Sequence, residues 1–314
     1  MKPTPQRLVF GQELVALGGE NDRIVVLDAD VSSSTQTKHF QAAFPQRFFN
    51  FGIAEANMVS AAAGLASCGY VPFVSTFALF ISLRAGDQVR SQIAYTRANV
   101  KLVGGYAGLS DFADGASHQS VEDIAVMRSI PHVTILSPCD IRQTQLAVRA
   151  AAELDGPVYL RISRAEVAQV APADAPFEVG RANTLRAGDD VTIIAAGPIV
   201  AASMQAAETL AGEGVSARVI DMHTIKPLDC EAVARAAEET GAIVTVEEHN
   251  VFGGLGGAVC EAVCASRPVP VIRVGIPDRF GESGQYDQIL HRAGLDAEAI
   301  IAAARKATEA KGTA

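Results

Sequence analysis

Arg23-Ile24-Val25-Val26-Leu27-Asp28-Ala29-Asp30 is a short apolar run that ends abruptly in two acidic residues. A run of this length, bounded by polar residues, is typical of a strand buried on both faces of a sheet. The chain repeats the pattern at residues 47–51, 71–75, 100–104, 133–137 and 157–162. Alanine-rich residues 54–67 lie between two of these runs and predict a packed helix. This alternation predicts a mainly parallel sheet with helices on both faces.

A second series of apolar runs follows a change of composition near residue 170. Residues 171–176 contain two prolines and predict a turn-prone linker. Further strands are predicted at residues 190–197, 216–221, 242–246 and 271–274. We therefore expect an α/β protein with two doubly wound, mainly parallel-sheet domains. They would comprise residues 1–170 and a smaller unit of residues 187–314, joined by a linker over residues 171–186.

The composition limits the partners and the location of the protein. The 314 residues are 49% hydrophobic and 19% charged, as in globular proteins, and the net charge is −9. That charge argues against nucleic acid and against an anionic membrane surface as partners. The amino terminus lacks the apolar run of a signal peptide, and no uninterrupted apolar stretch reaches the roughly 18 residues of a membrane span. We expect a cytoplasmic protein.

The cysteines predict neither a zinc site nor a disulfide framework. There are five of them, an odd number, and no two are spaced as Cys-x-x-Cys. Small thiols packed in a protein of a reducing compartment are the expected explanation.

Polar and glycine residues gather directly after the predicted strands, at residues 28–34, 52–57, 104–108 and 163–164. Ligands of open parallel sheets bind beyond the carboxyl ends of the strands, so we predict a site built from these loops. Taken singly, the residues also have structural explanations. Glu55 begins a predicted helix, where the helix dipole favours an acid. His118 could pack a loop, and Arg161 and Arg164 could be surface charges.

Residues 252–258 form a glycine-rich run, Phe-Gly-Gly-Leu-Gly-Gly-Ala, between a predicted strand and a predicted helix. The spacing differs from the Gly-x-Gly-x-x-Gly dinucleotide fingerprint. We interpret the run as a place of tight packing between strand and helix.

Several motifs together resemble the last two domains of transketolase, and most closely the separate carboxy-terminal chain of split transketolases. The resemblance covers nearly the whole chain and keeps the order of the family's motifs. Four segments occur in the first domain: Phe-Gly-Ile-Ala-Glu-Ala-Asn-Met at residues 51–58, residues 75–77, residues 84–88, and Asp-Gly-Ala-Ser-His-Gln at residues 114–119. Three more occur in the second domain, at residues 224–229, 246–250 and 275–284.

The resemblance implies a thiamine diphosphate enzyme in which this chain supplies the pyrimidine side of the cofactor site. Glu55 would be catalytic, since the family's glutamate hydrogen-bonds the aminopyrimidine ring and promotes its activation. Phe77 and Phe80 would pack on that ring, and Arg84 and Asp30 would line the cofactor site. The family's Gly-Asp-Gly…Asn segment for the diphosphate and Mg²⁺ is missing here. We therefore expect no metal ligand on this chain and a partner, the amino-terminal subunit, in an α2β2 complex.

The reaction implied is transfer of a two-carbon ketol unit from a ketose phosphate, or a related modified sugar, to an aldehyde. By resemblance, Asp114 binds a sugar hydroxyl, and His118 is a catalytic and substrate-binding histidine that steadies the reacting oxygens. The phosphate end of the sugar would be bound by Ser34 and Arg164, together with Arg7.

Three departures from the family pattern concern this substrate end. Tyr106 stands where the family usually has a phosphate-binding histidine, and we count it among the substrate-binding residues. Residues 110–113, Ser-Asp-Phe-Ala, replace a glycine-rich acidic stretch, and Ala116 replaces a proline. We therefore hypothesise a branched, sulfonated or unusually phosphorylated sugar.

Three alternatives stay open from the sequence. The chain could be the β subunit of a 2-oxo acid dehydrogenase, although residues 114–119 and the pair Ser163-Arg164 favour transketolase. Residues 84–85 also resemble a 1-deoxyxylulose 5-phosphate synthase. A non-catalytic partner subunit is the third, and the presence of Glu55, Asp114 and His118 argues against it.

Overall fold

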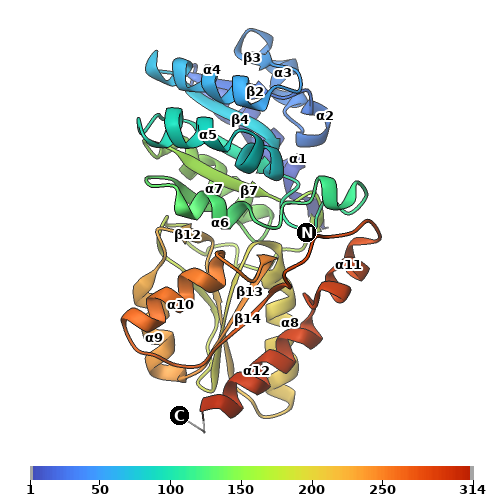
Figure 1. Cartoon of the computed structure of the whole chain (residues 1–314), viewed down its shortest axis with the longest axis vertical. Coiled ribbons are helices and arrows are strands. Elements are labelled where there is room, and N and C mark those ends of the chain that lie inside the picture. Colours follow the sequence, from blue (N-terminus) through green and yellow to red (C-terminus); the bar gives the residue numbers. More distant parts are fainter. Residues whose placement is uncertain (1–2, 312–314) are drawn as a thin grey trace.

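The computed structural model describes residues 3–311 as two α/β units arranged along the long axis of the molecule (Figure 1). The first contains a seven-stranded sheet in the order β12-β6-β7-β5-β4-β2-β3. Six of its strands run parallel, and the edge strand β12 pairs antiparallel with β6. The strands are β2 (Ile24–Asp28), β3 (Phe48–Asn50), β4 (Val71–Phe77), β5 (Lys101–Gly105), β6 (Thr134–Leu136), β7 (Val158–Ile162) and β12 (Thr224–Lys226).

Helices cover both faces of this sheet because residues along each strand point alternately to the two sides. In β2, Ile24 and Val26 join the cluster that holds α1, α3 and α7, whereas Val25 and Leu27 face α4 and the segments after β4. The helices are α1 (Gln6–Glu20), α2 (Ser32–Thr35), α3 (Lys38–Ala43), α4 (Glu55–Ser67), α5 (Gly86–Gln88), α6 (Asp123–Ser129) and α7 (Ile141–Glu153). Two π-helical segments, Phe80–Arg84 and Val89–Ala94, flank α5.

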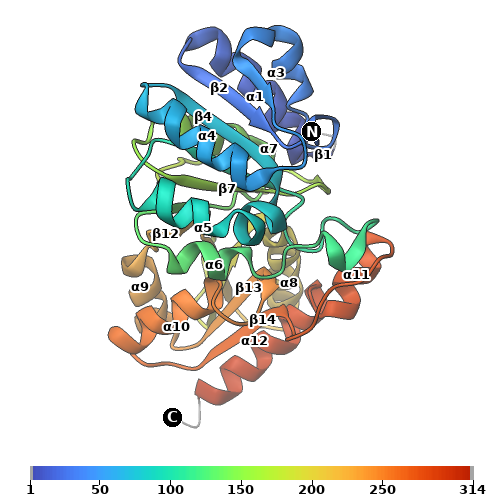
Figure 2. The ribbon, with the colours of Figure 1, turned by 45° about the horizontal axis from the view of Figure 1, so that its top comes forward.

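The second unit has a five-stranded sheet in the order β14-β13-β10-β11-β9, parallel except at β9. Its strands are β9 (Asn183–Arg186), β10 (Val191–Ala196), β11 (Ala217–Asp221), β13 (Ile243–Asn250) and β14 (Val271–Ile276). Helices α8 (Val200–Gly212) and α12 (Ala297–Lys311) pack on one face. On the other face lie α9 (Cys230–Thr240) and α10 (Leu255–Ala265), while α11 (Tyr286–Ala293) lies near the first unit (Figure 2).

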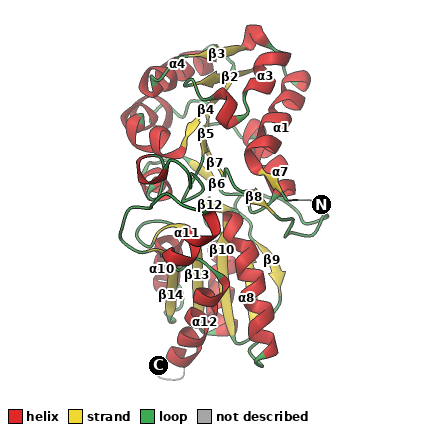
Figure 3. Cartoon of the chain, turned by 90° about the vertical axis from the view of Figure 1, so that its right-hand side faces the viewer, coloured by secondary structure: helices red, strands yellow, loops and turns green. Residues whose placement is uncertain are grey.

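The predicted α/β fold with two mainly parallel sheets is confirmed, and all ten predicted strands occur. Figure 3 shows strands in yellow with helices in red around them. The strands that were not predicted are short and antiparallel: β9, β12, and the pair β1 (Thr4–Pro5) and β8 (Glu166–Val167). Two of them change the expected organisation. β9 forms from the expected linker, and β12 comes from the second unit but completes the sheet of the first.

The glycine-rich run packs as expected. A Cβ on Gly254 would collide with the carboxylate of Glu247, and one on Gly256 would lie 2.8 Å from Oγ1 of Thr245. The first turn of α10 therefore lies directly against β13. Among residues 3–311, no helix is both long enough and apolar enough to cross a membrane.

Candidate active site

The polar residues that follow β2, β4, β5 and β7 meet at one edge of the first sheet, because these strands are parallel. Asp30 follows β2, Phe77 ends β4, Tyr106 follows β5 and Arg164 follows β7. The structure therefore brings most of the predicted site residues together at the predicted place.

Glu55 is the first residue of α4 and is only 2% exposed. Its Oε1 accepts a hydrogen bond from Nη1 of Arg84 at 2.9 Å. Its Oε2 is buried and has no hydrogen-bond partner within the protein. A buried carboxylate oxygen without a donor is unfavourable, so this geometry suits a donor that arrives with a ligand.

Arg84 ends a π-helical turn, Phe80–Arg84, that lies across from Glu55. Its guanidinium lies 4.0 Å from the ring centroid of Phe80, an attractive cation–π distance. Short π-helical turns are frequent at functional sites because the wider turn redirects side chains. Here the turn directs Arg84 to the carboxylate of Glu55 and places Phe80 beside the Arg84 guanidinium.

An aromatic group extends from Phe80 across the site. Phe77 stacks on Phe80 at 5.8 Å and on Tyr106 at 4.4 Å between ring centroids. His118 meets Phe77 and Phe80 edge-on, at 5.8 and 5.4 Å. Its Nδ1 lies 2.9 Å from the hydroxyl of Ser117. The group offers flat apolar surface beside the Arg84–Glu55 pair, with the imidazole of His118 at its border.

Tyr106 joins the residues predicted for the substrate's phosphate end. Its backbone has a left-handed φ of +59°, which is unfavourable for a bulky residue and typical of functional sites. Its hydroxyl accepts a hydrogen bond from Nη1 of Arg7 at 2.7 Å. The same nitrogen donates to the backbone carbonyl of Ser34 at 2.9 Å, and Arg164 lies 5.1 Å from the Tyr106 ring. In this arrangement Ser34 contacts Arg7 through its backbone carbonyl and not through its side chain.

Asp111 neutralises the charge of Arg164. Its Oδ1 accepts from Nη1 of Arg164 at 2.7 Å, and Asp114 lies 3.8 Å from the same nitrogen. Oδ2 of Asp111 is buried without a hydrogen-bond partner. Burial, together with the neighbouring Asp114, raises the pKa of Asp111 to about 6, although Arg164 opposes the shift. Sequence reasoning noted residues 110–113 only as a departure and did not identify this ion pair.

Asp30 lies at the border of the site, in a turn held by Asn50. Its carboxylate accepts from the amide of Asn50 at 3.0 Å, and its backbone N–H donates to the same side chain at 3.1 Å. Asp28 fixes the start of this turn from within the sheet, through N–H of Val31 and the hydroxyls of Thr35 and Thr37. Burial raises the pKa of Asp28. Asn50 was not predicted, and its only sequence signal is its place at a strand end.

Comparison with known proteins identifies the family to which the chain belongs. Residues 3–169 match the family profile described as "Transketolase, pyrimidine binding domain", and residues 180–300 match "Transketolase, C-terminal domain". The chain belongs to the transketolase family, whose members are generally thiamine diphosphate enzymes that also use a divalent metal.

Relatives of similar length define the kind of subunit. The chain is 44% identical to the 6-deoxy-6-sulfo-D-fructose transketolase subunit SqwH of Clostridium sp., over 95% of this chain and 92% of the relative. It is 43% identical to one of the subunits of the apulose-4-phosphate transketolase of Phocaeicola vulgatus, over 94% of each. A solved structure, titled split gene transketolase, inactive beta4 tetramer, matches with a TM-score of 0.90 and 46% identity, over 98% of this chain and 99% of that chain. The chain is thus a carboxy-terminal transketolase subunit.

The residues present suit the pyrimidine end of thiamine diphosphate. The unpartnered Oε2 of Glu55 suits a ring nitrogen that can share a proton with it, and Phe77 and Phe80 supply a flat apolar neighbour. Within residues 3–311 there is no group of three or more acidic, histidine or cysteine side chains able to hold a metal ion.

Proposed function

We propose that this chain, joined to a second subunit that binds the diphosphate, transfers a two-carbon ketol unit from a ketose to an aldehyde. The observation that carries the proposal is the buried Glu55 carboxylate, with one oxygen held by Arg84 and the other free for a ligand. A non-functional helix-start acid would be expected to lie in solvent or to have both oxygens satisfied.

The bound cofactor supplies the electron sink for carbon–carbon bond cleavage. Glu55, whose position is fixed by Arg84, would hydrogen-bond the pyrimidine ring and share a proton with it. Phe77 and Phe80 would pack on the ring and exclude water from it. His118, at the border of the aromatic group, is placed to hydrogen-bond the oxygens of the sugar.

The partner belongs to the same proposal. The Mg²⁺ ligands are assigned to the partner chain, and a symmetric α2β2 complex is expected, since symmetric assembly is the rule among oligomers. The solved relative that contains β chains alone is described as inactive, which supports a requirement for a second chain. A cytoplasmic location is also proposed, because the five cysteines are free thiols, as is usual in reducing compartments. The expectation that they are buried is wrong for all but Cys139.

For the substrate we propose a modified sugar with an anionic end. Tyr106 occupies one side of the predicted anion site, Asp111 offsets the charge of Arg164, and Asp114 lies 3.8 Å from the same nitrogen, so at most one net positive charge remains from Arg7 and Arg164. That balance suits a monoanion such as a sulfonate better than a phosphate dianion. Relatives named for 6-deoxy-6-sulfo-D-fructose and for apulose 4-phosphate support a modified sugar, and the first of them also supports a monoanion.

The test is a donor screen with the reconstituted two-chain complex and D-ribose 5-phosphate as one of the acceptors. 6-deoxy-6-sulfo-D-fructose and apulose 4-phosphate should give a higher kcat/KM than D-xylulose 5-phosphate. Full-rate turnover with D-xylulose 5-phosphate and D-ribose 5-phosphate would disprove the modified-sugar proposal. Acyl transfer to a lipoyl acceptor would instead identify a 2-oxo acid dehydrogenase.

A further inference from the structure

The loop that carries the predicted substrate residues is held by the second unit. We call residues 106–119 the substrate loop, because Tyr106, Asp114 and His118 lie on it. The carbonyl of Phe112 accepts from N–H of Gly284 at 2.9 Å, and the Gln119 amide donates to the carbonyl of Glu282 at 3.0 Å. In Figure 2 the loop lies beside the segment that leads into α11. The shape of the loop therefore depends on residues about 170 positions later in the chain.

Glu248 makes the central contact of this arrangement. It lies on β13 and is only 2% exposed. Its Oε1 accepts from N–H of Leu109 at 2.7 Å, and its Oε2 accepts from the hydroxyl of Tyr286 at 2.7 Å. The ring of Tyr286 in turn packs 5.9 Å from that of Phe112. One carboxylate thus connects the loop, β13 and the first residue of α11.

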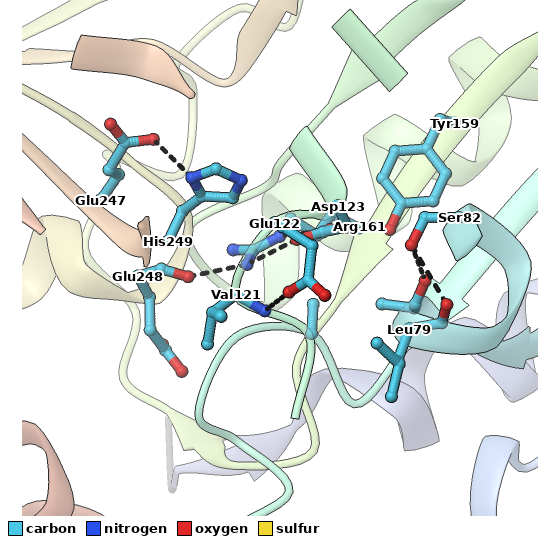
Figure 4. A network of polar contacts seen from close by, with 12 residues as sticks. Leu79, Ser82, Val121, Glu122, Asp123, Tyr159, Arg161, Glu247, Glu248 and His249 are labelled. Carbon is cyan, nitrogen blue, oxygen red and sulfur yellow. Dashed lines mark hydrogen bonds and ion pairs between the residues drawn. The ribbon is translucent and has the colours of Figure 1, made fainter. Parts of the chain in front are cut away.

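The backbone of Glu248 is itself anchored to the first sheet. Arg161 on β7 donates from Nη2 to the carbonyl of Glu248 at 2.7 Å (Figure 4). The same guanidinium forms a buried pair with Asp123, at 2.9 Å from Nε and 3.2 Å from Nη2. Tyr159 donates to Asp123 at 2.7 Å. Because Arg161 is buried and paired, the backbone of Glu248 has a fixed position relative to β7.

The loop backbone is built to approach this carboxylate. Gly108 has a φ of +64°, and a Cβ there would lie only 2.6 Å from Oε1 of Glu248. Any side chain at this position would push the loop away, so glycine is required by both conformation and space.

We propose that Glu248 and Tyr286 are positioning residues for the transketolase reaction: they fix the substrate loop so that Asp114 and His118 face the sugar. The inference rests on the proposed roles of Asp114 and His118 in binding the substrate. Neither Glu248 nor Tyr286 touches the cofactor-facing residue Glu55 through the contacts described above, so their effect should fall on the sugar rather than on thiamine diphosphate.

Glu247 provides a matched control on the same strand. It is also 2% exposed, but its two carboxylate oxygens accept from N–H of Leu255 and Gly256, at 2.6 and 2.7 Å, and so cap α10. Glu247→Gln makes the same chemical change at the neighbouring position, but it removes no hydrogen bond to the substrate loop. It should lower the midpoint of thermal unfolding and leave KM unchanged.

The experiment compares three variants in the reconstituted complex, with D-xylulose 5-phosphate and 6-deoxy-6-sulfo-D-fructose as donors. Glu248→Gln should raise the donor KM about tenfold, and Tyr286→Phe, which keeps the ring, about threefold. Half-saturation by thiamine diphosphate should stay within about twofold of the wild-type value. Amide hydrogen exchange of residues 106–119 should accelerate in Glu248→Gln and not in Glu247→Gln.

An unchanged KM in Glu248→Gln would overturn the inference, and so would an equal rise in Glu247→Gln. If Glu248→Gln does not fold, the same criteria apply to Tyr286→Phe. A wild-type complex without turnover on either donor would contradict the proposed function instead. In that case amide hydrogen exchange tests the positioning role. Equal exchange rates of the substrate loop in the Glu248→Gln and Glu247→Gln variants would overturn that role.

Discussion

Arg84 binds one oxygen of Glu55 at 2.9 Å and leaves the other buried without a partner. The two residues lie 29 positions apart in the chain, at the start of α4 and at the end of a π-helical turn. The pair fixes the orientation of a carboxylate while keeping one acceptor available. This is the arrangement expected of a group that must exchange a proton with a bound ring.

Replacing Glu55 by Gln should abolish most of the activity without preventing assembly. The amide keeps an acceptor for Arg84 but cannot exchange a proton, so kcat should fall by about 10²–10⁴-fold. Steady-state rates and size-exclusion chromatography of the complex measure the two effects. Glu213→Gln, which removes a surface ion pair with Arg305, is the control and should keep the wild-type rate. A Glu55→Gln complex with near-normal kcat would contradict the assignment.

Replacing Tyr106 by His should shift preference toward ordinary sugar phosphates. An imidazole can donate to a phosphate oxygen, whereas the tyrosine hydroxyl accepts from Arg7 at 2.7 Å and occupies its guanidinium. The ratio of kcat/KM for D-xylulose 5-phosphate to that for 6-deoxy-6-sulfo-D-fructose should rise about tenfold. Tyr106→Phe removes only the hydroxyl. It therefore distinguishes the effect of releasing Arg7 from the effect of introducing an imidazole. An unchanged ratio in both variants would exclude Tyr106 from specificity.

Asp111 should make the binding of anionic donors depend on pH. Because its pKa is raised to about 6, the carboxyl is charged at neutral pH, pairs with Arg164, and loses that charge as pH falls through this value. Asp111→Asn keeps an acceptor for Arg164 but removes the charge, so KM for D-xylulose 5-phosphate should fall about threefold to tenfold near pH 7.5. The difference from wild type should narrow at about pH 5.5. A difference in KM independent of pH would refute this role.

The same shift predicts a stability effect of defined sign. The folded-state pKa of Asp111 is above its unfolded value, so the folded chain binds more protons between the two. The stability contributed by the protonated form is complete below the unfolded pKa and is lost as pH rises through about 6. Asp111→Asn should therefore raise the thermal midpoint relative to wild type at about pH 7.5, and less so at about pH 5. A midpoint gain that grows toward acid pH would contradict the prediction.

The buried pair Arg161–Asp123 should be far more important for stability than surface pairs. Burial opposes a charged Asp123, but Arg161 outweighs it and holds the pKa of that carboxyl below its usual value. Asp123→Asn leaves Arg161 buried without its counter-charge, which should reduce the free energy of unfolding by about 3–5 kcal/mol. Urea denaturation measures the loss. Arg305→Ala, which breaks the exposed pair of Arg305 and Glu213, should change the free energy of unfolding by less than about 1 kcal/mol. Similar losses in Asp123→Asn and Arg305→Ala would contradict this prediction.

Local sequence patterns predicted the parallel strands and the site at their ends, because apolar runs and the polar residues after them are neighbours in the chain. They did not predict β12, whose three residues become a strand only by pairing with β6, about 90 positions earlier. The explanation of Arg161 as a surface charge was wrong: it is 5% exposed, because Asp123 compensates its charge inside the protein. Asp111 was missed for the same reason, since its partner Arg164 is 53 residues away.

The roles of the site residues and the domain boundaries at residues 170 and 187 stay predictions. Asp30, Ser34, Phe77, Phe80, Arg84 and Asp114 have positions in the structure that agree with a site, but their functions depend on a ligand and on the partner chain. Local sequence patterns do not contain information about long-range contacts or about a second subunit.

The central claim is that this chain is one half of a thiamine diphosphate transketolase site, and turnover by each chain separately and by the mixture tests it most directly. The chain alone should show no thiamine-diphosphate-dependent ketol transfer, and the mixture with the diphosphate-binding subunit should restore it. The restored rate should vanish with Glu55→Ala. Turnover by this chain alone, or an undiminished rate in the Glu55→Ala complex, would contradict the account.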